Sequence, residues 1–190
     1  LHYWALFFFA GFSYAFITLS TTSIVGVIIS LDRENFMYLK SLPFSMKNYL
    51  KQKFLFAFIV ETLIPLILGI VFIFIAKLPL LLGVLFLAGL IIGIFLLCHH
   101  YFARDFRLLY LEWQNLTELF NRGGVFIQFV SLFSSLIIGL ISILLINYFL
   151  NNLTPIWQTI VSVLTAAIPI LACVSTVKWY NKRFWSHLSD

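Results

Sequence analysis

Residues 80–98 read LLLGVLFLAGLIIGIFLLC and carry no charged side chain. About 20 apolar residues in a helix cross the hydrocarbon core of a bilayer, so this stretch is long enough to span one. Hydrocarbon offers no partner to unpaired backbone groups, which favours a helix. The stretch also lacks the alternation of apolar and polar residues that is typical of a membrane barrel strand. It therefore predicts a transmembrane helix.

The rest of the chain has the same character. Of its 190 residues, 62% are hydrophobic and only 10% are charged. Soluble domains average about 45–50% hydrophobic and about 25% charged residues. This composition excludes disordered, fibrous, nucleic-acid-binding and ordinary cytosolic proteins. The cysteines, Cys98 and Cys173, lie in or beside apolar runs and predict neither a disulfide framework nor a metal site. We predict an all-α integral membrane protein.

Five apolar runs are long enough to be membrane-spanning helices. They cover residues 4–29, 54–75, 80–98, 125–149 and 156–177. Two long polar segments, residues 31–53 and 99–124, and a tail, residues 178–190, complete the chain. We treat residues 1–190 as a single transmembrane domain. Because the chain begins at Leu1 without a methionine, we expect it to be a piece of a longer polypeptide and a larger bundle.

The basic residues predict the orientation of these spans. Eleven of the twelve lie in the two long segments and the tail, which fall on one side of a five-span topology, and only Lys77 lies on the other. The positive-inside rule places that basic side in the cytoplasm. The net charge of +5 is therefore a topology signal, and we expect no nucleic-acid partner.

The first cytoplasmic segment contains a short amphipathic run followed by a proline. Phe36, Leu39 and Leu42 recur at helical spacing, and Pro43 ends that helix. Ser45 is suited to be the N-cap of a second helix that continues into the next span. One interpretation is an interfacial helix on lipid headgroups, which amphipathicity alone favours. The other is an element that docks a cytoplasmic partner.

This segment resembles the signature loop of permease subunits of type 2 ATP-binding-cassette exporters. Those permeases typically carry Ser-Leu-Glu-Gly-Lys-Asn-Phe-Trp-x-Leu-Lys-Ser-Leu-Pro-x-Ser after a membrane helix. The matching residues here are Ser30, Leu31, Asn35, Phe36, Leu39, Lys40, Ser41, Leu42, Pro43 and Ser45. The chain departs from the pattern at Asp32, Arg33 and Glu34, where the family has Glu-Gly-Lys.

The second cytoplasmic segment resembles another stretch of the same family, Asp-x-Lys/Arg-x-Pro-x-Leu-x-Trp-x-Asn-x-Thr-Glu. The matching residues are Asp105, Arg107, Leu111, Trp113, Asn115, Thr117 and Glu118, and Leu109 replaces the family's proline. Its periodicity is ambiguous. One helix face would hold Phe102, Phe106, Leu109, Trp113, Leu116 and Phe120, whereas Leu111, Trp113, Asn115 and Thr117 alternate as in an extended segment. This segment is either an interfacial helix or a second contact with a partner ATPase.

The resemblance implies a transport subunit and no enzyme activity in this chain. A separate cytoplasmic ATPase would bind ATP and Mg²⁺, and residues 36–45 would transmit its motion to the membrane helices. The sequence has no G-x-x-x-x-G-K-S/T loop, so we expect no cofactor on the chain itself. The other expected partners are the lipid bilayer of a bacterial cytoplasmic membrane and a second permease copy or half. The transported substrate is open.

Glu61 is the one acidic residue deep in a predicted span. A charge there costs about 2.5–3.5 kcal/mol on insertion scales, so it should face a cavity or a partner. It is either a residue of the translocation pathway or the partner of a polar group on a neighbouring helix. Two other functions stay open: an ion-coupled carrier or channel subunit that uses Glu61, and a lipid-modifying membrane enzyme that uses Glu61, His99 or His100. We interpret the histidines as an interfacial pair.

Overall fold

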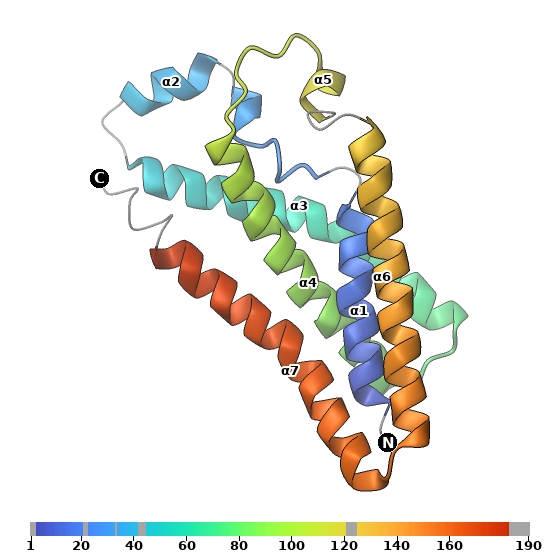
Figure 1. The fold of residues 1–190 in the computed structure, drawn as a ribbon. Coiled ribbons are helices and arrows are strands. Elements are labelled where there is room, and N and C mark those ends of the chain that lie inside the picture. Colours follow the sequence, from blue (N-terminus) through green and yellow to red (C-terminus); the bar gives the residue numbers. More distant parts are fainter. Residues whose placement is uncertain (1–2, 21–22, 33, 42–44, 121–124, 183–190) are drawn as a thin grey trace.

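The computed structural model describes residues 3–20, 23–32, 34–41, 45–120 and 125–182. Within these ranges every regular element is a helix, which confirms the predicted all-α class (Figure 1). The elements are α1 (Trp4–Leu19), the 3₁₀ helix η1 (Ser30–Asp32), α2 (Glu34–Ser41), α3 (Met46–Ile75), α4 (Leu80–Arg107), α5 (Leu116–Phe120), α6 (Val125–Asn152) and α7 (Pro155–Tyr180).

Four of these helices, α3, α4, α6 and α7, are long and apolar enough to cross a membrane. They contain the predicted spans 54–75, 80–98, 125–149 and 156–177 and continue beyond them. For example, α3 begins at Met46, where the Asn48 backbone N–H donates to the Oγ of Ser45 at 3.4 Å. Ser45 is thus the N-cap that the sequence predicts.

The first predicted span, residues 4–29, differs from the structure. The helix α1 ends at Leu19, and residues 25–29 form turns. Sixteen residues give a helix of about 24 Å, shorter than the roughly 30 Å of the hydrocarbon core. The cause is tertiary: the backbone N–H groups of Ile24 and Val25 donate to the carboxylate of Glu61 on α3 instead of to helical carbonyls.

The helices run back and forth between two ends of the bundle (Figure 1). The start of α1 and the turns between α3 and α4 and between α6 and α7 lie at one end. At the other end lie η1, α2, residues 108–115 and α5. We call this second group of elements the loop end.

Close contact between α1 and α4 depends on glycine. A Cβ atom added to Gly11 would lie 1.9 Å from the carbonyl oxygen of Phe86, and one added to Gly89 would lie 1.9 Å from that of Phe8. A Cβ on Gly93 would lie 2.6 Å from the Cβ of Ala15. Small residues allow helix backbones to approach this closely in membranes, where van der Waals packing drives association.

The outer faces of the long helices are apolar and exposed. Phe74 on α3 is 78% exposed, and Leu80 at the start of α4 is 84% exposed. Large apolar side chains on the outside of α6 and α7 include Phe133, Ile138, Leu144, Ile156, Ile168 and Leu171. Apolar surface this extensive marks contact with lipid. Together with the lengths of the helices, it identifies a multi-pass membrane protein.

Candidate functional site

Asp105, the first residue of the second family-like motif, is fully buried near the end of α4 (0% exposed). Its Oδ2 accepts the backbone N–H groups of Ile29 and Ser30 at 2.8 and 3.1 Å. Its Oδ1 accepts the Ser30 hydroxyl at 2.5 Å. These donors satisfy a buried carboxylate that would otherwise be costly. They also join the first residues of the two motifs.

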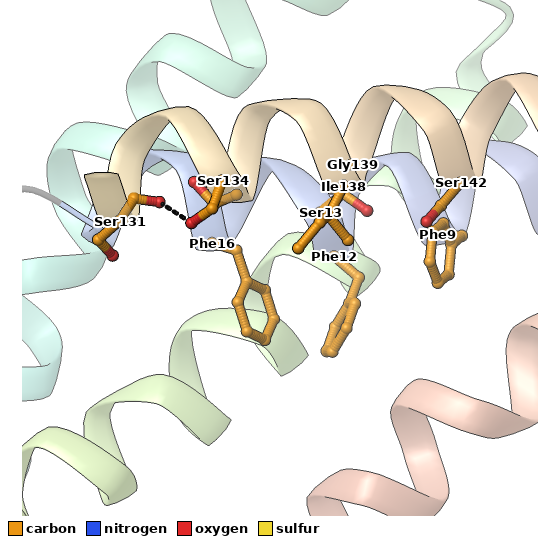
Figure 2. A pocket seen from close by; sticks show the side chains of 10 residues that line it. Phe9, Phe12, Ser13, Phe16, Ser131, Ser134, Ile138, Gly139 and Ser142 are labelled. Atoms are coloured by element: carbon orange, nitrogen blue, oxygen red, sulfur yellow. Dashed lines mark hydrogen bonds between the residues drawn. The ribbon is translucent and has the colours of Figure 1, made fainter. Parts of the chain in front are cut away.

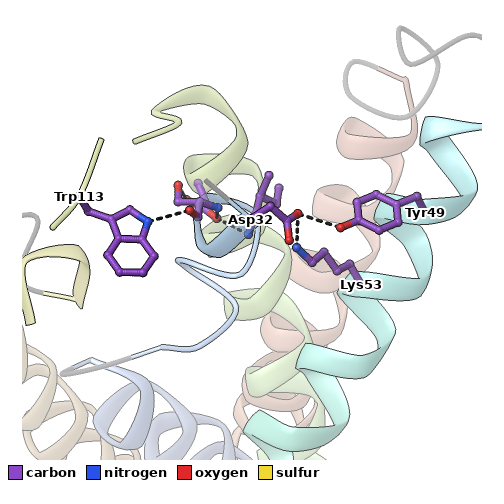
Figure 3. A network of polar contacts seen from close by, with 7 residues as sticks. Asp32, Tyr49, Lys53 and Trp113 are labelled. Atoms are coloured by element: carbon purple, nitrogen blue, oxygen red, sulfur yellow. Dashed lines mark hydrogen bonds and ion pairs between the residues drawn. The ribbon is translucent and has the colours of Figure 1, made fainter. Parts of the chain in front are cut away.

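Ser30 makes two further contacts with the second motif. Its Oγ accepts the backbone N–H of Tyr110 at 3.2 Å, and its carbonyl oxygen accepts the indole N–H of Trp113 at 2.9 Å. Figure 3 shows the indole pointing toward this backbone. Because the Tyr110 N–H donates to Ser30 instead of to a helical carbonyl, α4 ends before it, although Leu109 replaces the family's proline.

Asp32 fixes the other end of η1 to α3. Its carboxylate accepts the Tyr49 hydroxyl at 2.8 Å and forms an ion pair with the ammonium group of Lys53. The Asp32 and Lys53 side chains are only 18% and 16% exposed, so solvent screens the pair less than a surface pair. Figure 3 shows both α3 side chains reaching toward Asp32. Thus η1 is bonded to α4 through Ser30 and to α3 through Asp32.

The helix α2 carries the proposed ATPase-coupling residues. Phe36 is buried (5% exposed) in the core, Leu39 is half-buried, and Asn35 is exposed. Lys40 and Ser41 lie in the helical backbone of α2, whereas Leu42 and Pro43 lie outside the described residues.

The remaining residues of the second motif are spread along the loop end. The guanidinium of Arg107 lies over the Trp179 ring of α7, 5.4 Å from its centroid, and Leu111 is half-buried and packs against the core. Asn115, Thr117 and Glu118 are exposed at α5. The segment is therefore helical through Arg107, irregular after it and helical again in α5, so neither single periodicity describes it.

Glu118 helps to shape the turn before α5. Its carboxylate accepts the Tyr110 hydroxyl and, at 3.1 Å, the backbone N–H of Gln114. These two hydrogen bonds, of which the one from Tyr110 has the larger effect, hold the pKa of Glu118 below its ordinary value.

Glu61 is bonded to the turns that follow α1. One carboxylate oxygen accepts the Ile24 N–H at 2.7 Å, the Val25 N–H at 3.3 Å and the Ser23 hydroxyl at 3.4 Å. The Glu61 carboxylate therefore contacts the backbone of the segment that follows α1. Accepting hydrogen bonds from this segment is a structural role that the sequence alone does not reveal.

The histidines lie among aromatic rings. The Nδ1 of His99 is 3.0 Å from the Phe95 carbonyl oxygen, and its ring packs on Phe54 at 4.5 Å between centroids. The Nδ1 of His100 is 3.5 Å from the Tyr180 hydroxyl. Among the residues that the structure describes, no three His, Cys, Asp or Glu side chains gather as metal ligands.

Sequence reasoning treated the two motifs as separate and missed the bonds between them. It also missed Tyr49 and Lys53 as partners of Asp32. An aspartate at the polar end of an apolar helix, such as Asp105, weakly predicts that the carboxylate has a hydrogen-bond partner. Which residue is that partner follows only from the fold. The chain matches no protein-family model, no curated protein and no solved structure.

Proposed function

We propose that this chain is a permease subunit of an ATP-driven exporter, with the loop end in the cytoplasm of a bacterial cell and docked on a separate ATPase. The ATPase binds ATP and Mg²⁺, and this chain supplies the membrane helices. The substrate crosses between this helix bundle and a second permease copy or half. The orientation is that of the positive-inside rule.

One observation supports this proposal most strongly. The two motifs that resemble the exporter family lie 75 residues apart in sequence, yet the carboxylate of Asp105 bonds directly to Ser30. This direct contact supports the proposal that the two motifs act as one unit.

The contacts also supply a route for force. When ATP closes the ATPase dimer, a push on α2 reaches η1, which precedes α2 almost directly in the chain. From η1 the displacement passes to α4 through Ser30 and Asp105, and to α3 through Asp32 and Lys53. Buried hydrogen-bonded and ion-paired links of this kind are stiff because breaking one leaves a buried charge without its partner.

The two alternative functions gain no support from the described residues. One oxygen of the Glu61 carboxylate accepts hydrogen bonds from the turn after α1, and ion coupling through Glu61 stays an alternative proposal. The ring of His99 packs against Phe54 and Phe95, whereas His100 is exposed, and a lipid-modifying enzyme stays the other alternative.

The test is co-purification with an ATP-binding-cassette ATPase that is co-expressed with this chain. Asn35→Arg and Tyr38→Asp change two exposed positions of α2 and should reduce recovery of the ATPase at least tenfold, as expected for the loss of about 1.4 kcal/mol or more of binding free energy. Lys77→Gln is the matched control, because Lys77 is exposed at the opposite end of the bundle. Undiminished recovery and undiminished substrate-stimulated ATP hydrolysis with both α2 variants would contradict the proposal.

A further inference from the structure

A groove of about 410 Å³ lies between α1 and α6, away from the loop-end contacts. Its size is within the range of small-molecule sites. One wall is a ladder of phenyl rings from α1, namely Phe9, Phe12 and Phe16. Figure 2 shows the three rings pointing to the same side of α1, beside α6. Neighbouring rings lie 6.1 and 5.0 Å apart between centroids.

The facing wall is a ladder of hydroxyl groups. Serines recur along α6 with helical periodicity and line the groove together with Ile138 and Gly139 (Figure 2). They are Ser131, Ser134, Ser135 and Ser142. Two of them are satisfied within the helix, since Ser134 and Ser135 donate to the carbonyl oxygens three residues earlier. Within the described part of the chain, the Ser142 hydroxyl makes no such bond.

Ser13 on α1 distinguishes this groove from an ordinary row of small residues. Its side chain is buried (7% exposed) and lines the groove opposite Gly139, where an added Cβ would lie 3.6 Å from the Cβ of Ser13. Among the described residues its hydroxyl has no hydrogen-bond partner, in contrast to Thr18 further along α1, which donates to the carbonyls of Tyr14 and Ala15. No buried side-chain oxygen of the described residues lacks a partner, so the Ser13 hydroxyl is open to the groove, where a bound molecule can pair with it.

We propose that the α1–α6 groove binds an uncharged amphipathic molecule. Its hydroxyl, carbonyl or amide groups lie against Ser13 and Ser142, and its apolar chain lies against the phenyl ladder. No charged side chain is among the residues that line the groove; a charged ligand group would therefore be desolvated without compensation. This inference goes beyond the proposed function, because binding here requires no ATPase.

Photo-crosslinking in lipid nanodiscs tests the proposal. The probe is a monoacylglycerol that carries a diazirine in its acyl chain, and a phosphatidylglycerol with the same chain is the charged comparison. The monoacylglycerol should label residues 9–16 and 131–142 more strongly than the lipid-facing surface of α7, and the charged lipid should not. Equal labelling of all lipid-facing helices, or equal labelling of the groove by both lipids, would overturn the proposal.

Two variants and a control sharpen the test. Ser142→Leu fills the groove and should abolish the preferential labelling, whereas Ser175→Leu makes the same change on an exposed face of α7 and should leave it intact. Ser13→Ala is the milder variant, with about fivefold weaker labelling expected for the loss of one hydrogen bond. Unchanged labelling in Ser13→Ala and Ser142→Leu would sink the idea. So would efficient bismaleimide cross-linking of Ser135→Cys chains into dimers, because a second copy would then occupy the groove.

Discussion

The carboxylate of Asp105 accepts the hydroxyl of Ser30 at 2.5 Å, across 75 residues of sequence. Two backbone N–H groups also donate to this carboxylate, and the residue is fully buried. This contact lies at the centre of the loop end and has a consequence for stability.

Replacing Asp105 by Asn should destabilise the protein by about 2–3 kcal/mol, because hydrogen bonds to a charged group are worth about 1.5–3 kcal/mol and one acceptor oxygen is lost. Urea unfolding in detergent micelles measures the change. Glu112→Gln is the control, because Glu112 is exposed and the substitution removes the same charge. It should shift the unfolding free energy by no more than about 0.5 kcal/mol. Equal effects of the two substitutions would show that charge alone, rather than the Ser30 contact, matters.

Gly89→Ala should separate α1 from α4. The added methyl group would lie 1.9 Å from the Phe8 carbonyl oxygen, a backbone atom that cannot turn aside. Overpacking of this kind typically costs about 1–3 kcal/mol, and thermal unfolding monitored by circular dichroism measures it. Gly139→Ala is the control, since its added Cβ makes only an ordinary contact at 3.6 Å with Ser13. If both variants melt like the parent, the α1–α4 contact is looser than the structure has it.

Glu61→Leu should release the turns after α1. The Ile24 and Val25 amides would lose their acceptor, and their hydrogen exchange should accelerate about tenfold or more, corresponding to the loss of a hydrogen bond to a charged group. Amide exchange read by mass spectrometry on peptides from residues 20–30 measures this. Glu61→Gln keeps one carbonyl acceptor and should show an intermediate rate. Full protection in both variants would mean that the turns hold without this carboxylate.

The hydrogen bond between Tyr110 and Glu118 should make the turn before α5 sensitive to acid. The folded pKa of Glu118 lies below its ordinary value of 4.5. Its stabilising contribution is therefore complete above that ordinary value and is lost as the pH falls through the folded pKa. Carboxyl-carbon NMR of labelled glutamate follows the titration. In Tyr110→Phe the pKa of Glu118 should rise toward 4.5, and in Tyr148→Phe, which alters an exposed tyrosine of α6, it should not move.

The long apolar runs could be predicted from sequence because hydrocarbon imposes one solution on each of them. That is why α3, α4, α6 and α7 contain their predicted spans. The helix ends were predicted less well, since polar residues such as those of α4 up to Arg107 continue a helix beyond the hydrocarbon core. The predicted N-cap at Ser45 is present because capping is local chemistry.

The contacts that define the candidate site could not be predicted in the same way. The end of α1 at Leu19 is coupled to a carboxylate on another helix, and Glu61 lies 37 residues from Ile24. The pairing of Ser30 with Asp105 likewise requires the packed bundle. Periodicity and motif spacing describe a single segment. They carry no information on which donor of one segment meets which acceptor of another.

Within the irregular stretch before η1, Val25 and residues 27–29 are buried, and Val25 and Ile29 are wholly inaccessible. Non-helical backbone is tolerated at membrane depth only under such cover. Each end of the stretch is also fastened, at Ile24 by Glu61 and at Ser30 by Asp105. The segment between Ile24 and Ser30 therefore has a fixed length: inserting or deleting even one residue there would pull one of these two contacts out of register.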